Sequence, residues 1–177
     1  MNKDENKKKI IVSAFLLIFA FTGSYLIYFI LQITLNTPTP MVVVVSRSME
    51  PNIHVGDLLF LRGVDDPSQI KAGTVEDMTG DVIVYDPRGL WPGAPNDPIV
   101  HRVIDKYHDG QRWWFLTKGD NNNCPDPAWI PEENIIGIVV GRIPYIGYAK
   151  IFLTDSGLLI PLLVILSMLL VISIVWD

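Results

Sequence analysis

Two long apolar runs, one near each end of the chain, restrict its fold more than any other feature of the sequence. Residues 10–35 and 157–175 contain no charged side chain. A helix needs about 20 apolar residues to cross the hydrocarbon layer of a bilayer, where it satisfies its own backbone hydrogen bonds. Both runs therefore predict membrane-spanning helices, in agreement with a hydrophobic share of 49% among the 177 residues.

The first run predicts a permanent anchor rather than a cleaved signal peptide. It is longer than the apolar core of about 7–15 residues in such peptides, and no small-x-small motif follows it. Lysines are concentrated ahead of it, and an excess of lysine beside a first helix favours the cytoplasmic side of the membrane. For the second run, an alternative is a tail that lies on the membrane surface or packs against a partner. The expected order is a cytoplasmic basic tail (1–9), a transmembrane helix (10–35), an extracytoplasmic domain (36–156) and a second transmembrane helix (157–176).

The segment between the two runs predicts a small, mainly antiparallel β domain tethered to the membrane at both ends. Its apolar stretches are five to eight residues long, rich in Val, Ile and aromatic residues, and bounded by Gly, Pro and Asp, as is typical of short strands. The Asp109-Gly110 pair between two such stretches predicts a hairpin. The predicted strands cover residues 42–46, 56–62, 81–85, 99–106, 112–117 and 135–142, with irregular connections at 63–80 and at the proline-rich 86–98.

Charge and cysteine content exclude some classes of protein. The net charge of −5, with basic residues scattered through the domain, gives no reason to expect nucleic acid as a partner. The single cysteine, Cys124, cannot form an internal disulfide, so the hydrophobic core must hold the domain together.

Candidate catalytic side chains lie at strand ends and inside one strand. Ser46 and Ser48 follow the four valines of the stretch VVVVSRSMEP. His101 lies within the apolar stretch IVHRVI, where a buried imidazole needs hydrogen-bonding partners. Asp120 and Asp126 lie in the loop FLTKGDNNNCPD that leaves another strand. A core histidine with satisfied nitrogens and an Asn- and Pro-rich turn explain these two stretches without any catalytic role.

Taken together, these residue types fit a serine hydrolase. A serine hydroxyl is a weak nucleophile that needs a base, and a carboxylate can orient the imidazole that acts as that base. A metal site formed by His101, Asp120 and Asp126 is disfavoured because the short ligand spacings of common metal motifs are missing, and no metal or cofactor is expected. Spacing alone leaves Ser46 and Ser48 interchangeable.

Five sequence blocks extend this interpretation. SRSMEP, GDLLFLR, GDVIVY, IVHRVI and TKGDNN occur in this order, with Asp126 six residues beyond Asp120. Together they resemble type I signal peptidase, and the resemblance covers essentially the whole of 36–156 and the first anchor. Bacterial members have a lysine before the arginine of the fourth block. This chain has His101 before Arg102, as in the archaeal and endoplasmic-reticulum branch, in which serine, histidine and aspartate are implicated.

The resemblance implies a role for each matching residue. Ser48 takes the position of the nucleophile and His101 that of the general base. Asp126 matches the essential aspartate, and Asp120 supports it or the local structure. Ser46 takes the place of a residue that helps to hold the oxyanion in bacterial members.

The substrate implied by the resemblance is the signal peptide of an exported preprotein, cut after a small residue with another small residue two positions earlier. An extended substrate can add as a strand to an open sheet edge, and shallow apolar pockets then accept only small side chains. Arg47, where many relatives have glycine, is a departure that alters the approach to the site. The residues expected to line the substrate edge are Val43, Val44, Val45, Ile99 and Val100.

The expected function is therefore that of a membrane-bound serine endopeptidase that removes signal peptides. The expected partners are preprotein signal peptides, the lipid bilayer, and the Sec translocon or other signal peptidase subunits. The expected membrane is the plasma membrane of an archaeon, or the endoplasmic reticulum. An alternative is a non-catalytic subunit or scaffold of a signal peptidase complex, although every matching polar residue is present.

Overall fold

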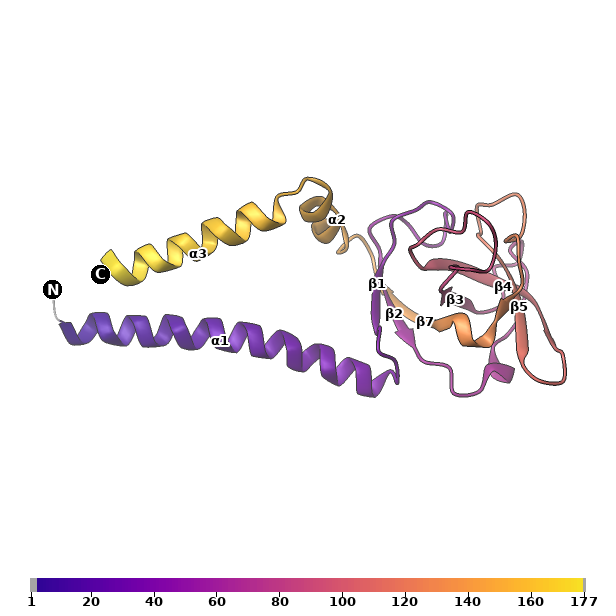
Figure 1. The fold of residues 1–177 in the computed structure, drawn as a ribbon, viewed down its shortest axis with the longest axis horizontal. Helices are drawn as coiled ribbons and strands as arrows, with labels where there is room; N and C mark the ends of the chain where they lie inside the picture. Colours follow the sequence, from indigo (N-terminus) through magenta and orange to yellow (C-terminus); the bar gives the residue numbers. More distant parts are fainter. Residues whose placement is uncertain (1–2, 177) are drawn as a thin grey trace. The chain divides into compact units, whose positions relative to one another are not determined.

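The chain divides into a β unit and a helical unit, each described here by itself. The computed structural model describes residues 3–176, and it places the side chains of 11, 12, 14, 15, 18, 19, 22–158 and 160–169. The β unit is Gln32–Tyr148, and the helical unit combines Met1–Leu31 with Ala149–Asp177 (Figure 1).

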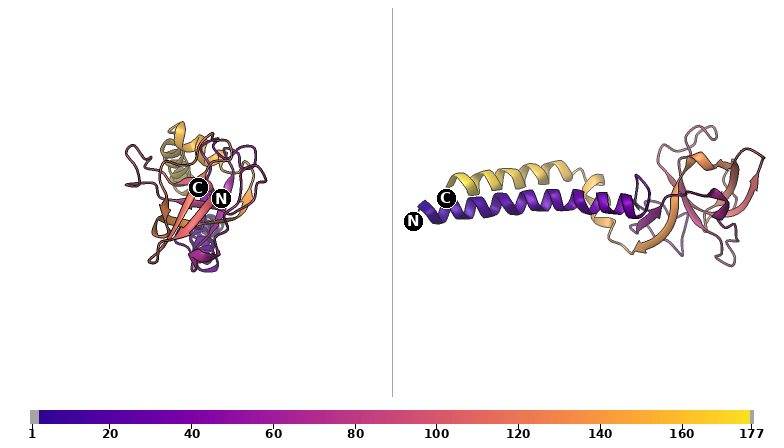
Figure 2. Two further views of the ribbon diagram at one scale, coloured as in Figure 1. Left: turned by 90° about the vertical axis from the view of Figure 1, so that its right-hand side faces the viewer. Right: turned by 90° about the horizontal axis from the view of Figure 1, so that it is seen from below.

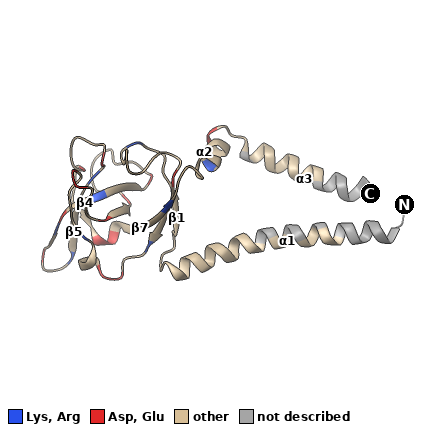
Figure 3. Cartoon of the chain, turned by 180° about the vertical axis from the view of Figure 1, so that it is seen from behind, with Lys and Arg blue, Asp and Glu red and all other residues tan. Residues whose placement is uncertain are grey.

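Three helices account for the ends of the chain. They are α1 (Lys3–Thr34), α2 (Tyr148–Asp155) and α3 (Leu159–Trp176). The residues of α1 and α3 whose side chains are placed carry no charge, and Figure 3 draws them in tan. Among the described residues, no single helix meets the length and hydropathy expected of a membrane span, whereas α2 and Ile160–Leu169, bent by 94°, meet them as a pair.

Two differences from the sequence-based expectation concern these helices. Helix α1 begins within the predicted basic tail, and the side chains of that tail lie outside the described residues. Helix α2 was not predicted, because its eight residues make little more than two turns and give no clear helical periodicity.

The β unit contains one curved sheet of seven strands (Figures 1 and 2). All neighbouring strands are antiparallel, in the order β1-β2-β7-β3-β4-β5-β6, which confirms the predicted antiparallel β domain. The strands are β1 (Met41–Val43), β2 (Leu58–Arg62), β3 (Val82–Tyr85), β4 (Ile99–His108), β5 (Trp113–Lys118), β6 (Ile130–Pro131) and β7 (Ile135–Ile143), with short 3-10 turns at Pro67–Gln69 and Glu132–Asn134.

Each of the six predicted strands is present, with different ends. The largest difference is at β1, which ends at Val43, so that Ser46 lies in a loop and not in the strand predicted over 42–46. Strand β6 was missed because it has only two residues, one of them a proline. The predicted hairpin joins β4 to β5: Gly110 has a φ of 97°, and Asp109 Oδ1 accepts hydrogen bonds from the backbone N–H groups of Gln111 and Arg112.

Two clusters of buried apolar side chains hold the unit together. The first contains Tyr85, Val103 and Phe115 and lies where β3, β4 and β5 meet. The second combines Leu59 and Leu61 of β2 with side chains from the segment between β1 and β2. This segment therefore contributes to the core, and its buried side chains hold in place the backbone that carries its polar residues. Its buried side chains are Val44, Met49 and Ile53.

Candidate active site

A closed loop carries both serines. We call residues 44–57 the serine loop. At its neck, the Val44 N–H donates to the Asp57 carbonyl and the Gly56 N–H donates to the Val44 carbonyl, each at 2.9 Å. Gly56 has a φ of 86°, a conformation that favours glycine. Met49, 1% exposed, anchors the middle of the loop in the core.

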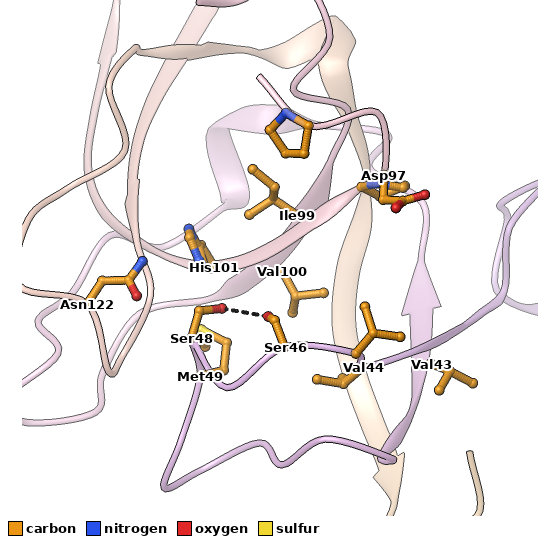
Figure 4. A pocket seen from close by; sticks show the side chains of 13 residues that line it. Val43, Val44, Ser46, Ser48, Met49, Asp97, Ile99, Val100, His101 and Asn122 are labelled. Atoms are coloured by element: carbon orange, nitrogen blue, oxygen red, sulfur yellow. Dashed lines mark hydrogen bonds between the residues drawn. The ribbon is translucent and has the colours of Figure 1, made fainter. Parts of the chain in front are cut away.

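The two serine hydroxyls contact each other. Ser46 Oγ and Ser48 Oγ are 3.2 Å apart and share one hydrogen bond (Figure 4). Ser46 is exposed, whereas Ser48 is half-buried beside the buried Met49. Ser48 is thus the better fixed of the two, because its immediate neighbour in the chain is part of the core.

His101 and Asp126 form a buried pair. Nδ1 of His101 lies 2.9 Å from Oδ1 and 2.7 Å from Oδ2 of Asp126, and the two side chains are 6% and 7% exposed. The Tyr85 hydroxyl donates to Oδ2 at 2.7 Å, and the Thr117 hydroxyl donates to the same oxygen. An ionised carboxylate can only accept hydrogen bonds, so Nδ1 carries the proton. In the neutral imidazole the lone pair is then on Nε2.

The surroundings keep this carboxylate ionised. Burial by itself raises the pKa of Asp126, but the hydrogen bond and charge of His101, with the hydroxyls of Thr117 and Tyr85, lower it below its ordinary value. Burial and the neighbouring carboxylate raise the pKa of Tyr85 well above its usual range. The phenol therefore stays protonated and keeps donating to Asp126.

The free nitrogen of His101 points to a glycine. A Cβ added at Gly119 would lie 2.8 Å from His101 Nε2, 2.6 Å from the Ser48 carbonyl oxygen and 2.8 Å from Asn122 Nδ2. These three polar atoms therefore converge on one small volume, which is open because residue 119 has no side chain. A backbone hydrogen bond joins the loop after β5 to the serine loop at this point: the Asn121 N–H donates to the Ser48 carbonyl at 2.8 Å.

Asp120 has a different partner. Its Oδ1 accepts from Arg102 Nε at 2.8 Å and its Oδ2 accepts from Arg102 Nη2 at 2.7 Å. Both side chains are buried, at 1% and 6% exposed. Arg102 Nη1 donates to the backbone carbonyls of residues 78, 79 and 80, and Asn52 of the serine loop donates to Asp120 Oδ2 at 3.0 Å. Asp120 thus connects β4 with the serine loop and does not contact His101.

A pocket of about 380 Å³ opens beside Ser48. All five residues expected at the substrate edge line it, together with Ser46, Ser48 and His101. Its wall is mainly apolar, and Figure 4 shows Val44, Val100 and Ile99 along it. The lining residues that were not predicted are Met49, Pro95, Asp97, Pro98 and Asn122.

The missed lining residues carried only weak signals in the sequence. Pro95, Asp97 and Pro98 end the proline-rich connection directly before β4, so their place in the chain next to Ile99 was the one indication. Asn122 lies in a run of three asparagines that reads as a turn. Within residues 3–176, no group of three or more His, Cys, Asp and Glu side chains is arranged to hold a metal ion.

Known proteins resemble this chain over most of its length, although no family model matches it. The signal peptidase complex catalytic subunit SEC11 of Metarhizium robertsii is 38% identical over 132 residues, which cover 71% of this chain and 70% of the relative. SEC11 of Scheffersomyces stipitis is 34% identical over 148 residues, covering 79% and 81%. SEC11 of Candida tropicalis is 31% identical over 159 residues, covering 85% and 87%. The chain thus belongs to the family of signal peptidase complex catalytic subunits, the endoplasmic-reticulum type of type I signal peptidase.

Proposed function

We propose that this protein is a serine endopeptidase that removes signal peptides from exported preproteins, cutting after small residues. Ser48 is the nucleophile, His101 the general base and Asp126 the carboxylate that orients it. The observation that carries the proposal is the buried His101–Asp126 pair, whose free Nε2 is turned toward the serine loop. Membership in a family named for signal peptidase catalytic subunits supports the same reaction.

The first chemical step is attack by Ser48 Oγ on the scissile carbonyl while His101 Nε2 takes the hydroxyl proton. In the part of the chain that is described, Ser48 Oγ bonds to Ser46 Oγ, and no hydrogen bond joins it to Nε2. Such catalytic hydrogen bonds often tighten only when substrate is bound. Ser48 Oγ must therefore turn from Ser46 to His101 on the way to attack. His101 then gives the proton to the leaving amine.

Ser46 and the Ser48 backbone form the oxyanion site in this proposal. The Ser48 N–H has no hydrogen-bond acceptor among residues 3–176, so it is free to donate to a developing oxyanion. Ser46 Oγ lies beside the nucleophile and offers a second donor. One preorganised donor of this kind contributes about 3–4 kcal/mol to transition-state stabilisation.

The pocket supports binding of an extended substrate beside Ser48. Val43, Val44 and Val45 approach from one side, and Ile99 and Val100 approach from another. Strand β1 is an edge strand, so its outer side can pair with an extended substrate. In this proposal the apolar walls receive the small side chains at the cleaved bond.

Asp120 has a structural role in this proposal. Its bidentate pair with Arg102 and its bond from Asn52 hold the histidine strand and the serine loop at a fixed separation. This role requires no contact with the reacting atoms.

The location and partners follow from the family and the terminal helices. We include in the proposal that residues 10–35 and 157–176 anchor the enzyme, with the N-terminus cytoplasmic and the β unit on the other side. The long uncharged stretches in α1 and α3 support this arrangement. The eukaryotic relatives favour the endoplasmic reticulum over an archaeal membrane, and their name favours assembly with other subunits.

The test is cleavage of a preprotein by membranes containing the full chain or its variants. Ser48→Ala is expected to reduce cleavage to background while leaving the fold intact. Ser46→Ala is the matched control and is expected to lose about 10²–10³-fold, as when one oxyanion donor is removed. Full activity of Ser48→Ala would contradict the proposal, and an inactive parent would favour a non-catalytic subunit.

A further inference from the structure

Asn122 is a polar side chain of the pocket that has no hydrogen-bond partner among the described residues. Asn122 is half-buried and lines the pocket with Ser48 and His101. Its backbone is held, because its N–H donates to the Gly119 carbonyl at 2.9 Å. Its side-chain amide makes no hydrogen bond to any other part of the described chain. The group therefore presents one acceptor and two donors to whatever occupies the pocket.

This amide lies next to the nitrogen that moves the proton. Asn122 Nδ2 and His101 Nε2 are each 2.8 Å from the same point above Gly119, so their separation cannot exceed the sum of these distances. Figure 4 shows Asn122 and Ser46 on opposite sides of Ser48, with the valines of the pocket on the Ser46 side. If the acyl part of a substrate occupies the valine side, Asn122 faces the side from which the amine leaves and water enters.

The neighbouring asparagines do not share this arrangement. The Asn121 side chain donates to the Arg47 carbonyl at 3.2 Å, outside the pocket. Asn123 is exposed and is not part of the pocket wall. Within the run of three, only Asn122 has its amide free and directed at the site.

We propose that Asn122 positions the water that hydrolyses the acyl-enzyme. This inference rests on the proposed function, because it requires an acyl group on Ser48. The Asn122 Nδ2–H donates a hydrogen bond to the water oxygen, and one O–H of the water donates to His101 Nε2.

The step balances without any further reactant. The water oxygen bonds to the ester carbonyl carbon while one water proton passes to His101 Nε2. The bond between this carbon and Ser48 Oγ then breaks, and the proton returns from Nε2 to Oγ. The products are a free carboxylic acid and the restored Ser48 hydroxyl.

The experiment separates formation of the acyl-enzyme from its hydrolysis. The full chain, purified in detergent with any accompanying subunits, is given a peptide substrate and an activated ester with the same acyl sequence. For the peptide, kcat/KM reports attack by Ser48. For the ester, whose acylation is fast, kcat reports hydrolysis of the acyl-enzyme.

For Asn122→Ala, ester kcat is expected to fall about tenfold, as for the loss of one hydrogen bond, and kcat/KM for the peptide is expected to stay within a factor of two. Acyl-Ser48 should accumulate in quenched samples measured by intact mass. Asn123→Ala, the matched control, should leave both rates unchanged. Asn122→Ser, which keeps a small donor and acceptor, should recover part of ester kcat.

Two results would overturn the inference. One is an unchanged ester kcat for Asn122→Ala. The other is an equal fall in peptide kcat/KM, which would assign Asn122 to the leaving peptide or to general structure. Failure of the proposed function looks different, since a parent enzyme that forms no acyl-Ser48 with either substrate would fail before Asn122 is tested.

Discussion

Two buried carboxylate pairs of this protein use residues that lie close together in the sequence, but the pairs differ in chemistry. His101 and Arg102 are adjacent on β4, and Asp126 and Asp120 leave β5 in one loop. The Arg102–Asp120 pair is bidentate and tied to three backbone carbonyls and to Asn52, so all its polar groups are engaged. In the His101–Asp126 pair, one histidine nitrogen is engaged and the other faces the pocket.

The difference shows how one strand can serve two purposes. Successive side chains of a strand point to opposite faces of the sheet. Arg102 thus joins a closed network on one face, and His101 reaches the pocket on the other. A guanidinium is always charged and suits a permanent connection, whereas an imidazole can exchange a proton near neutral pH. Variants in each pair should therefore fail in different ways.

Replacing Asp126 with Asn should produce the largest effect. The amide would present an N–H where the carboxylate accepts, so the histidine would adopt the wrong tautomer. Turnover is expected to fall about 10⁴-fold, with the fold retained, because the amide still accepts from Tyr85 or Thr117. Steady-state cleavage measures the fall in turnover, and circular dichroism measures whether the fold is retained. Activity within tenfold of the parent would show that Asp126 does not orient the base.

Asp120→Ala should affect stability rather than chemistry. It leaves the buried Arg102 guanidinium without its anion, which typically costs about 3–5 kcal/mol in the free energy of unfolding. Denaturant unfolding of the full chain in detergent measures this loss, and activity per folded molecule should change much less. A Asp120→Ala protein that is as stable as the parent but inactive would reverse the assigned roles.

Gly119→Ala tests the space between His101 and the serine loop. The new Cβ would come within 2.8 Å of His101 Nε2 and closer still to the Ser48 carbonyl oxygen, so one of them must move. A displacement near 1 Å can reduce turnover about 10²-fold. Single-turnover cleavage checks this effect, with Gly141→Ala, where an added Cβ would meet only Phe60 at 3.9 Å, as the control for expression. Unchanged turnover would mean that the site adapts freely.

The smallest expected effect is on how the stability of the protein changes at acidic pH. The pKa of Asp126 is lower in the folded protein than its ordinary value. Its ionised form therefore contributes stability above the unfolded value of about 3.9, and this contribution is lost as pH falls through the lower folded value. Melting temperatures between neutral pH and pH 3 should fall more for the parent than for Asp126→Asn. Parallel curves would show that the carboxylate is not stabilised by folding.

Much of the fold was accessible from the sequence, because short alternating stretches bounded by Gly, Pro and Asp leave few alternatives. The ends of β1 were not. Val44 looks like a continuation of the strand, but its N–H bonds at the neck of the serine loop instead. A valine has the same local preference in either place, so only the tertiary contacts decide.

For the candidate site, the five sequence blocks identified the candidate residues but did not predict which of them contact one another. Asp120 and Asp126 are equally polar neighbours in one loop, and their separate partners emerge only when β4 and β5 pair. Asn122 lies within the block TKGDNN, but this was only a weak signal, because an asparagine in a turn usually serves the turn itself. The catalytic roles of these residues stay predictions until the variants are measured.

The neck of the serine loop has an energetic consequence. Two backbone hydrogen bonds of Val44 close a segment that also buries Val44, Met49 and Ile53. The conformational entropy of bringing its ends together is therefore lost once, during folding, and not again at each encounter with a substrate. An incoming peptide meets a loop backbone that is already in place, with only the Ser48 hydroxyl left to turn, so more of its binding free energy is available to hold the scissile bond in position.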